Sequence, residues 1–483
     1  MGKGSKNKSK KLGSSNQLIK SLIAELFQKC VTPTESSAPS PKELFNVYKE
    51  IHEMILNIEK QKGPSAVSLL KGRVEYKAEF IEWAKKENIF FRSVELKTVR
   101  ESELGVFATK ELKESDLFIK VPRKAMLTSE MVAHSPIGPL VAADPMLSSM
   151  PNVALAVLLL SELYNENSKW RPYVNILPRS YSNILYFDID DVEMLKGTSV
   201  FLEALNILRS IARQYAYICN LLFKHPLGKQ LGLVNKITYA DYKWAVATLM
   251  TRQNPIPPVK GVAPVLALIP FLDMCNHREG PASIDYNPEI ASCECFAPKV
   301  IHSGEEVLIH YGSRPNTELV VHNGFFNKEN SHDFFKLKLK ISNTDPLADS
   351  RKALISKLGL EEWYPLGCLP SPYTDALLAF LLISNASNEE LDALKQLDQV
   401  ELATKLREDT LVGSETKKKY LNFLKDRCSL LVKLIPKEME PSEEQLARSK
   451  YTSQLSAALR RNERKLLNDA ISYTENELKC FVE

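Results

Sequence analysis

The sequence predicts an α+β fold in which a small β region is interrupted by a long helical insert and followed by an all-α C-terminal domain. Three observations lead to this prediction. Short runs of β-branched and aromatic residues begin after Asn88 and return near residue 266. Helical spacing of apolar residues fills much of the stretch between these runs. The same helical spacing dominates after Ser342.

The composition is that of an ordinary soluble globular protein. Of 483 residues, 44% are hydrophobic and 25% are charged, and the length suits two or three domains. A net charge of +4 is nearly neutral, so we expect no nucleic-acid partner. We expect no signal peptide and no membrane association, because no apolar run has the length of a bilayer span.

Cysteine usage indicates an intracellular protein. Eight cysteines in so long a chain are sparse, which favours reduced thiols. We expect a monomer in the cytoplasm, with the nucleus as an alternative location.

The N-terminal part is predicted to contain a tail and then helices. Residues 1–20 are rich in lysine, serine and asparagine, which predicts a disordered tail, with an import signal as the alternative. Residues 21–92 are predicted to be a helical segment, which includes a helix from Val74 to Glu87.

The central region, residues 93–335, contains the predicted β runs. They lie at Val94–Thr98, Gly105–Thr109 and Leu117–Val121, and again at Leu266–Ile269 and Val307–Tyr311. A helical insert at about residues 150–262 separates the two groups. It includes a helix at 153–164. A second helix is expected to start after Thr238, because a threonine followed three residues later by Asp241 suits an N-terminal cap.

Residues 336–483 are predicted to form the helical C-terminal domain. Ser371 and Pro372 suit a helix start before Ala376–Ile383. Ser442 and Gln445 form a capping-box pattern before a long amphipathic run that ends near residue 473.

Four short segments carry the chemistry. Two of them, taken alone, are weak: a glycine before a strand in Glu103-Leu104-Gly105, and an Asn-His pair after an apolar strand at 276–277. The third segment, residues 305–312, is an apolar strand that delivers Tyr311 at its end. In the fourth, residues 322–326, backbone groups and an aromatic face could hold a flat ring.

In this order the segments resemble the SET domain, in the subclass with a helical insert and a helical C-terminal domain that includes the Rubisco large-subunit lysine methyltransferase. The likeness spans about residues 70–480 and is densest from Thr238 to Ser331. The strings Met250–Asn254, Leu266–Pro270 and Asp273–His277 are most similar to the branch of the family that methylates a histidine in actin.

The resemblance implies S-adenosyl-L-methionine as cofactor and a protein substrate, actin. It also implies a helical substrate-binding domain at 336–483. By position, cofactor contacts are expected from Arg73, Ser102, Glu103, Leu104, Arg252, Asp273, Met274, Cys275, Asn276, His277, Asn323, Gly324 and Phe325. The expected catalytic residues are Tyr311 and Asn254, and the expected substrate contacts are Asn254, Leu272, Asp273, Tyr311 and Arg314.

Two positions depart from the pattern that the resemblance implies. Leu272 stands where the histidine-specific branch is expected to carry tryptophan beside the substrate ring, and Asn323 stands in place of serine. The first departure concerns the choice of substrate rather than catalysis.

The residue types favour histidine as the methyl acceptor. A histidine with a pKa of about 6.5 is mostly neutral at pH 7, whereas a lysine with a pKa of about 10.4 is charged. The remaining task is to fix the imidazole tautomer, and the amide oxygen of Asn254 can accept a hydrogen bond from the ring N–H. Tyr311, with an ordinary pKa of about 10, suits orientation better than proton abstraction.

Two other functions are compatible with the same fold: a lysine methyltransferase and a catalytically silent binding module. A silent module should have lost Tyr311 or the Asn276-His277 pair, and the sequence has both. A zinc site at Cys275, His277, Cys293 and Cys295 is disfavoured because a single residue separates each pair, so no metal is expected.

Overall fold

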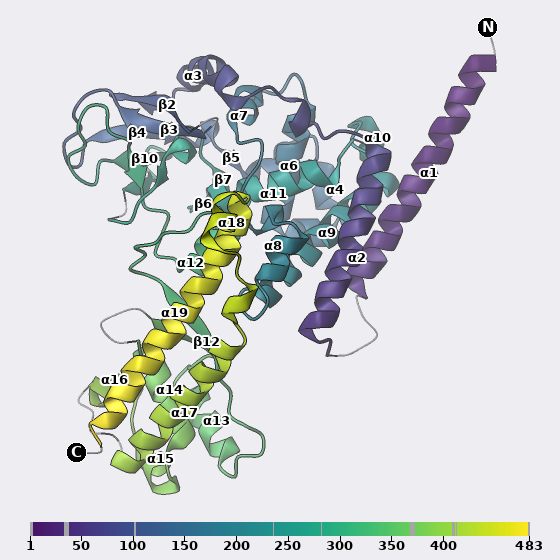
Figure 1. The fold of residues 1–483 in the computed structure, drawn as a ribbon. Helices are drawn as coiled ribbons and strands as arrows, with labels where there is room; N and C mark the ends of the chain where they lie inside the picture. Colours follow the sequence, from purple (N-terminus) through teal and green to yellow (C-terminus); the bar gives the residue numbers. More distant parts are fainter. Residues whose placement is uncertain are drawn as a thin grey trace. The chain divides into compact units, whose positions relative to one another are not determined.

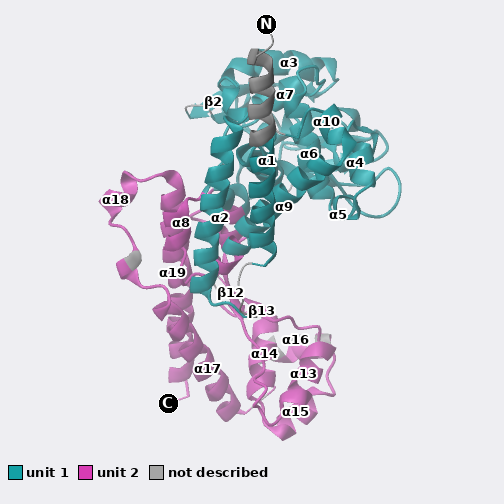
Figure 2. Ribbon diagram, turned by 90° about the vertical axis from the view of Figure 1, so that its right-hand side faces the viewer, with its two compact units in different colours: residues 1–186, 205–313, 322–324 teal, residues 187–204, 314–321, 325–483 magenta. Residues whose placement is uncertain are grey.

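The computed structural model describes residues 3–32, 38–100, 103–234, 236–281, 283–367, 372–407, 411 and 413–481. The chain forms two compact units, which Figure 2 distinguishes by colour. The first comprises residues 1–186, 205–313 and 322–324, and the second comprises residues 187–204, 314–321 and 325–483. Among the described residues, no helix is long and apolar enough to span a membrane.

Two long helices begin the first unit. Helices α1 (Lys3–Val31) and α2 (Pro41–Lys62) pack on each other, and Figure 1 shows them side by side. Ser40 caps α2 in a capping box with Glu43. The prediction of a disordered tail over residues 1–20 is wrong for at least residues 16–20, which are helical. Buried Ile19 and Ile23 place that end of α1 in a packed interface, which outweighs its polar composition.

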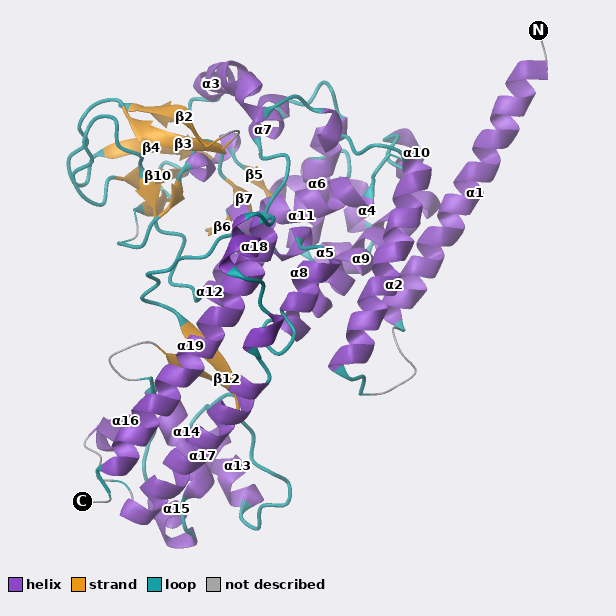
Figure 3. Cartoon of the chain, in the orientation of Figure 1, coloured by secondary structure: helices purple, strands orange, loops and turns teal. Residues whose placement is uncertain are grey.

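The predicted β region follows α3 (Lys77–Lys86) and forms several small sheets, drawn in orange in Figure 3. One antiparallel sheet has the order β1-β4-β10-β9, a hairpin joins β2 to β3, and a third sheet has the order β5-β7-β6. The strands are β1 (Phe90–Phe91), β2 (Val94–Arg100), β3 (Glu103–Ala108), β4 (Leu117–Pro122), β5 (Leu127–Thr128), β6 (Gln253–Ile256), β7 (Val265–Leu268), β8 (Asn276–His277), β9 (Ile284–Asn287), β10 (Ser292–Phe296) and β11 (Leu308–Ile309).

A helical insert separates β5 from β6, as the sequence predicted. Its core is α6, which packs on α11 and buries ten of its 14 residues. The helices begin earlier than the expected residue 150, at Gly138. They are α4 (Gly138–Ala142), α5 (Pro145–Ser149), α6 (Pro151–Tyr164), α7 (Arg171–Ile176), α8 (Ile189–Met194), α9 (Phe201–Lys224), α10 (Pro226–Gln230) and α11 (Tyr239–Arg252).

The second unit is mainly helical. Its core joins apolar residues of several helices and of one two-stranded sheet, among them Leu337, Leu366, Leu377, Leu424 and Leu467. Its elements after α8 are α12 (Asn316–Glu318), β12 (Phe334–Lys338), α13 (Ala348–Lys357), β13 (Trp363–Gly367), α14 (Asp375–Asn385), α15 (Asn388–Leu394), α16 (Gln399–Arg407), α17 (Ser414–Lys433), α18 (Glu443–Ala447) and α19 (Tyr451–Lys479).

Three predictions for this region need correction. Strand β13 lies beyond Ser342, where only helices were expected, because its residues pair with β12 across a distant stretch of chain. Helix α14 is capped by Thr374, whose side chain accepts from Leu377 N–H; Ser371 lies outside the described residues. The capping box at Ser442 is confirmed, but it starts the short α18, and the long helix α19 begins anew at residue 451.

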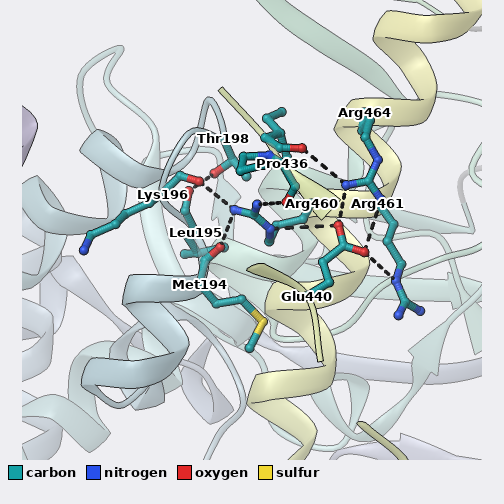
Figure 4. A network of polar contacts seen from close by, with 10 residues as sticks. Met194, Leu195, Lys196, Thr198, Pro436, Glu440, Arg460, Arg461 and Arg464 are labelled. Atoms are coloured by element: carbon teal, nitrogen blue, oxygen red, sulfur yellow. Dashed lines mark hydrogen bonds and ion pairs between the residues drawn. The ribbon is translucent and has the colours of Figure 1, made fainter. Parts of the chain in front are cut away.

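Residues 187–204, which the sequence placed in the insert, belong to the second unit because Arg460 of α19 holds them. The Arg460 side chain is 0% exposed. Its guanidinium donates to the carbonyls of Met194 (2.8 Å), Lys196 (2.6 Å) and Pro436 (2.9 Å). Figure 4 shows this network with Glu440, which also pairs with Arg461 and Arg464. Buried backbone carbonyls thereby gain charged donors, which stabilises this loop on the helix.

Candidate active site

The junction of α11 and β6 carries Arg252 and Asn254. Helix α11 begins at its Thr238 cap and ends at Arg252, and β6 starts with the next residue. The Arg252 guanidinium donates a hydrogen bond to the carbonyl of Asp273. The side-chain nitrogen of Asn254 donates to the carbonyl of Arg252 at 3.1 Å. Because a carbonyl only accepts, this bond sets the amide orientation and leaves the Asn254 oxygen as the acceptor.

A strained turn precedes the Asn-His pair. Phe271 has φ 73°, a left-handed conformation that costs about 1–3 kcal/mol for a bulky residue. Its buried ring stacks on Phe91 with ring centroids 4.4 Å apart, and on Phe80 at 6.1 Å. The packing holds the turn, and a 3₁₀ turn from Leu272 to Met274 follows it.

A buried cluster of charged and polar side chains surrounds this turn. The Arg73 Nε donates to the carbonyl of Ile176 at 2.8 Å, and its Nη2 lies 3.1 Å from the sulfur of Met274. The Tyr173 hydroxyl donates to the Asp273 carboxylate at 2.6 Å. Segments from residue 73 to residue 274 therefore meet at one place.

Burial and neighbouring charges together shift the pKa values of the charged groups in the cluster. Desolvation, together with neighbouring Arg252, lowers the pKa of Arg73 to about 9. Desolvation raises the pKa of Asp273, although Arg252 and Tyr173 oppose that shift. Two guanidinium groups accompany one carboxylate, and in the described part of the chain neither the buried Arg252 Nε nor the buried Asp273 Oδ1 has a hydrogen-bond partner. The cluster is therefore suited to an additional anionic group.

Strands β8 and β11 form a parallel pair that carries Asn276, His277 and, just after β11, Tyr311. Asn276 lies opposite Leu308 in the register. The Tyr311 hydroxyl donates to the carbonyl of Cys275 at 2.7 Å, and its backbone N–H donates to His277 Nδ1 at 3.2 Å. Burial raises the pKa of Tyr311 above its ordinary value, so the phenol stays protonated at neutral pH.

Glu306 connects the Asn276 segment to the strand that starts at Glu103. Its carboxylate accepts a hydrogen bond from the Asn276 side chain at 2.6 Å. It also lies against Gly105, where an added Cβ would sit 2.4 Å from Glu306 Oε1. The N–H of Val307 donates to the Val106 carbonyl at 2.7 Å. A side chain at position 105 would therefore force the Glu306 carboxylate and Val99 to move.

Gly324 permits another close approach. It has φ 81°, and an added Cβ would lie 2.5 Å from the backbone nitrogen of Asn183. The Asn183 side chain donates to the carbonyl of His322 at 3.3 Å. Asn323 thus lies on a segment that is fixed against residues 182–183.

The structure brings most of the expected residues together in the first unit. Arg314 and Phe325 belong to the second unit, where the Arg314 carbonyl accepts from Asn330 and the Phe325 N–H donates to the carbonyl of Leu319. Ser102 lies outside the described residues, and Glu103 is exposed. The side chains with exposures of 7% or less are those of Arg73, Leu104, Leu272, Asp273, Met274 and Cys275. Their roles as ligand contacts stay predictions.

Sequence reasoning missed three residues of this site. Tyr173 and Asn183 lie in the insert, and no motif distinguishes them from other polar residues of helices and loops. Glu306 lies in the segment 305–312, which the sequence singled out for Tyr311. Its contact with Gly105 becomes visible only in the structure.

The four residues considered as zinc ligands lie on two different parts of the β region. Cys275 precedes β8, whereas Cys293 and Cys295 lie in β10, and burial raises the pKa of all three thiols. Within the described ranges, no group of three or more His, Cys, Asp or Glu side chains is placed to hold a metal ion.

Solved structures with the same fold define the class of protein. The chain matches "Structure of Rubisco LSMT bound to AdoMet" with a TM-score of 0.67 at 19% identity, covering 83% of this chain and 92% of the other. It matches "Crystal structure of the SET domain of LSMT bound to Lysine and AdoHcy" with a TM-score of 0.66, also at 19% identity, covering 84% and 92%. The fold is thus that of a SET-domain protein. A family model described as "Rubisco LSMT substrate-binding" matches residues 342–467.

Full-length relatives give the family. The chain is 35% identical to the actin-histidine N-methyltransferase of Homo sapiens, covering 98% of this chain and 81% of the relative. Its identity to the enzyme of Xenopus tropicalis is also 35%, with 100% and 84% covered. The protein belongs to the actin-histidine N-methyltransferase family, and the resemblance inferred from the motifs is confirmed.

Proposed function

We propose that the protein is an S-adenosyl-L-methionine-dependent protein-histidine N-methyltransferase that acts on actin. Family membership over the whole chain supports the activity. The orientation of Asn254 supports histidine as the acceptor, and it is the observation that carries the proposal. Its amide nitrogen is engaged by the Arg252 carbonyl, so its oxygen is the group that can accept a hydrogen bond from an imidazole N–H.

The residues of the first unit fit the cofactor. The excess positive charge of Arg73 and Arg252 over Asp273 suits the cofactor carboxylate. The Asn276 side chain is held by the Glu306 carboxylate, which in turn lies against Gly105. When bound, the cofactor supplies a methyl group activated by its positively charged sulfur.

The role of the protein is to align the acceptor. Methyl transfer from a sulfonium is an in-line displacement, so the nitrogen lone pair must point along the line of the breaking bond. Asn254 holds the ring N–H, which leaves the other ring nitrogen as the nucleophile. Tyr311 stays protonated and donates to the Cys275 carbonyl, so it orients the reacting groups and does not remove a proton.

Lysine methylation is the second candidate, and Leu272 is the residue that favours it. An aliphatic residue stands where tryptophan was expected, and it is only 1% exposed. A lysine acceptor would, however, arrive charged and need deprotonation, for which the protonated Tyr311 is poorly suited. The silent-module alternative is disfavoured because Tyr311, Asn276 and His277 are all present.

We propose further that the protein works as a monomer in the cytoplasm, with the nucleus as a second location. We also propose that neither a nucleic acid nor a membrane is its partner. The near-neutral net charge of +4 supports the absence of a nucleic-acid partner. The cysteines that the structure describes are all free, which suits a reducing compartment.

The test is transfer of a tritiated methyl group from S-adenosyl-L-methionine into purified actin, followed by mass spectrometry of the labelled peptide. We expect label on one histidine, and labelling slowed by at least about 100-fold with Tyr311→Phe. Label on lysine would establish the second candidate instead. Absence of transfer, with cofactor binding intact, would favour the silent module.

A further inference from the structure

The loop between β6 and β7 presents two exposed valines next to the strand that carries Asn254. Val259 is 68% exposed and Val262 is 97% exposed, among the largest values for apolar residues in the described part of the chain. Gly261 between them has φ 88°, which turns the chain at the tip. Isolated apolar residues at a surface are common, so exposure alone does not identify a binding surface.

The backbone at the start of this loop is held by hydrogen bonds to the side chains of Arg123 and Glu130. Arg123 donates to the carbonyl of Pro257 at 2.8 Å and to the hydroxyl of Tyr286 at 2.9 Å. Glu130 pairs with Arg123 at 2.6 Å and accepts from the N–H of Val259 at 3.1 Å. These bonds hold the main chain at the start of the loop, up to Val259, whose side chain remains exposed. An anchored apolar surface loses little conformational entropy on binding.

The loop also continues directly from the candidate site. Asn254 pairs with Ala267 across the β6–β7 hairpin, and β6 ends at Ile256. Strand β6 is at the edge of its three-stranded sheet. At about 3.3 Å per residue, the five residues from Asn254 to Val259 span at most about 17 Å. If Asn254 binds the target histidine, an extended substrate chain can therefore reach the loop with a residue that lies within about five positions of that histidine.

We propose that Val259 and Val262 form a docking surface for an apolar side chain that flanks the target histidine in the protein substrate. The ligand is a protein segment, because a protein methyltransferase must position the chain on both sides of the acceptor. This inference rests on the proposed function. It assigns substrate specificity to a loop outside the residues that hold the cofactor.

The experiment compares Val259→Ser/Val262→Ser with the unaltered enzyme on peptides that contain the target histidine of actin. Val400→Ser in α16 is the matched control, because Val400 is 74% exposed and lies in the second unit. In a peptide series, each position within five residues of the histidine is changed to serine. We expect the loop variant to raise KM about tenfold, with kcat and cofactor affinity unchanged, and Val400→Ser to leave all three unchanged.

The peptide series identifies the contact. Serine at one apolar flanking position should raise KM for the unaltered enzyme by a similar factor, and the loop variant should show no further increase on that peptide. Equal KM values for the loop variant and the unaltered enzyme would overturn the inference. Loss of self-association in the loop variant, without a change in KM, would assign the surface to a second copy of this chain and also overturn it. If the unaltered enzyme methylates no histidine peptide, the proposed function itself fails.

Discussion

Gly105→Ala should weaken cofactor binding although residue 105 touches no predicted ligand group itself. The new Cβ would lie 2.4 Å from Glu306 Oε1 and 2.8 Å from a methyl group of Val99, whereas ordinary contact begins at 3.4 Å. The Glu306 carboxylate must therefore retreat by about 1 Å. Its 2.6 Å hydrogen bond to the Asn276 side chain would stretch beyond the range of a hydrogen bond.

The size of the effect follows from that bond. A hydrogen bond to a charged group contributes about 1.5–3 kcal/mol, which corresponds to about a 10- to 150-fold change in an equilibrium constant. The upper end applies if Asn276 binds the cofactor only in the orientation that Glu306 imposes. We therefore expect the Kd for S-adenosyl-L-methionine to rise by between one and two orders of magnitude.

Calorimetric titration of chelator-treated protein measures this change. Gly413→Ala is the control, because an added Cβ there meets nothing within 4 Å. Glu306→Ala and the double variant complete a thermodynamic cycle. Since both changes act through the same bond, the double variant should bind about as weakly as Glu306→Ala alone. Unchanged affinity in Gly105→Ala, or additive losses in the double variant, would refute the reasoning.

Three further predictions concern catalysis, specificity and pH. Tyr311→Phe should lower kcat by at least about 100-fold and leave the cofactor Kd within about twofold, as measured by methyl transfer and calorimetry; a matching loss of affinity would place Tyr311 in the binding site. Asn254→Phe should reduce histidine methylation by about 1–3 kcal/mol and raise lysine methylation relative to it, in a comparison of peptides that differ only at the target residue. A preference of the unaltered enzyme for the lysine peptide would contradict the histidine assignment. Burial raises the pKa of Glu463 from 4.5 to about 7, so the folded chain retains a proton that the unfolded chain releases between about pH 4.5 and 7. The contribution of Glu463 to the free energy of unfolding therefore falls as pH rises through that window. Glu463→Gln should raise the thermal unfolding midpoint at pH 8 more than at pH 5. Equal shifts at the two pH values would show that the pKa of Glu463 is not raised.

Local signals predicted the elements whose stability is local. Thr238 caps α11 and Ser442 caps α18, as their spacing to residues 241 and 445 indicates. The β runs after Asn88 also form strands, because turn residues separate short stretches of high β-propensity. The order of four motifs then predicted the SET fold.

Features that depend on distant contacts were not predictable from one sequence. Strand β13 forms because residues 363–367 pair with residues 334–338. The hydrogen bond from Tyr173 to Asp273 joins positions 100 residues apart in the chain. Arg460 reads as a solvated helix residue, yet its side chain is fully buried and satisfies three carbonyls. No periodicity in the sequence indicates such a partner.

The attachment of residues 187–204 to α19 has a consequence for biosynthesis. Met194 and Arg460 are 266 positions apart, so the carbonyls around residue 194 leave the ribosome long before their donor is made. At about 5–20 residues per second, the delay is about 13 to 53 s. During that time the segment emerges between two stretches that belong to the first unit, while its own unit is not yet synthesised. A nascent chain with such an interleaved order is a natural client for chaperones that shield unfinished segments.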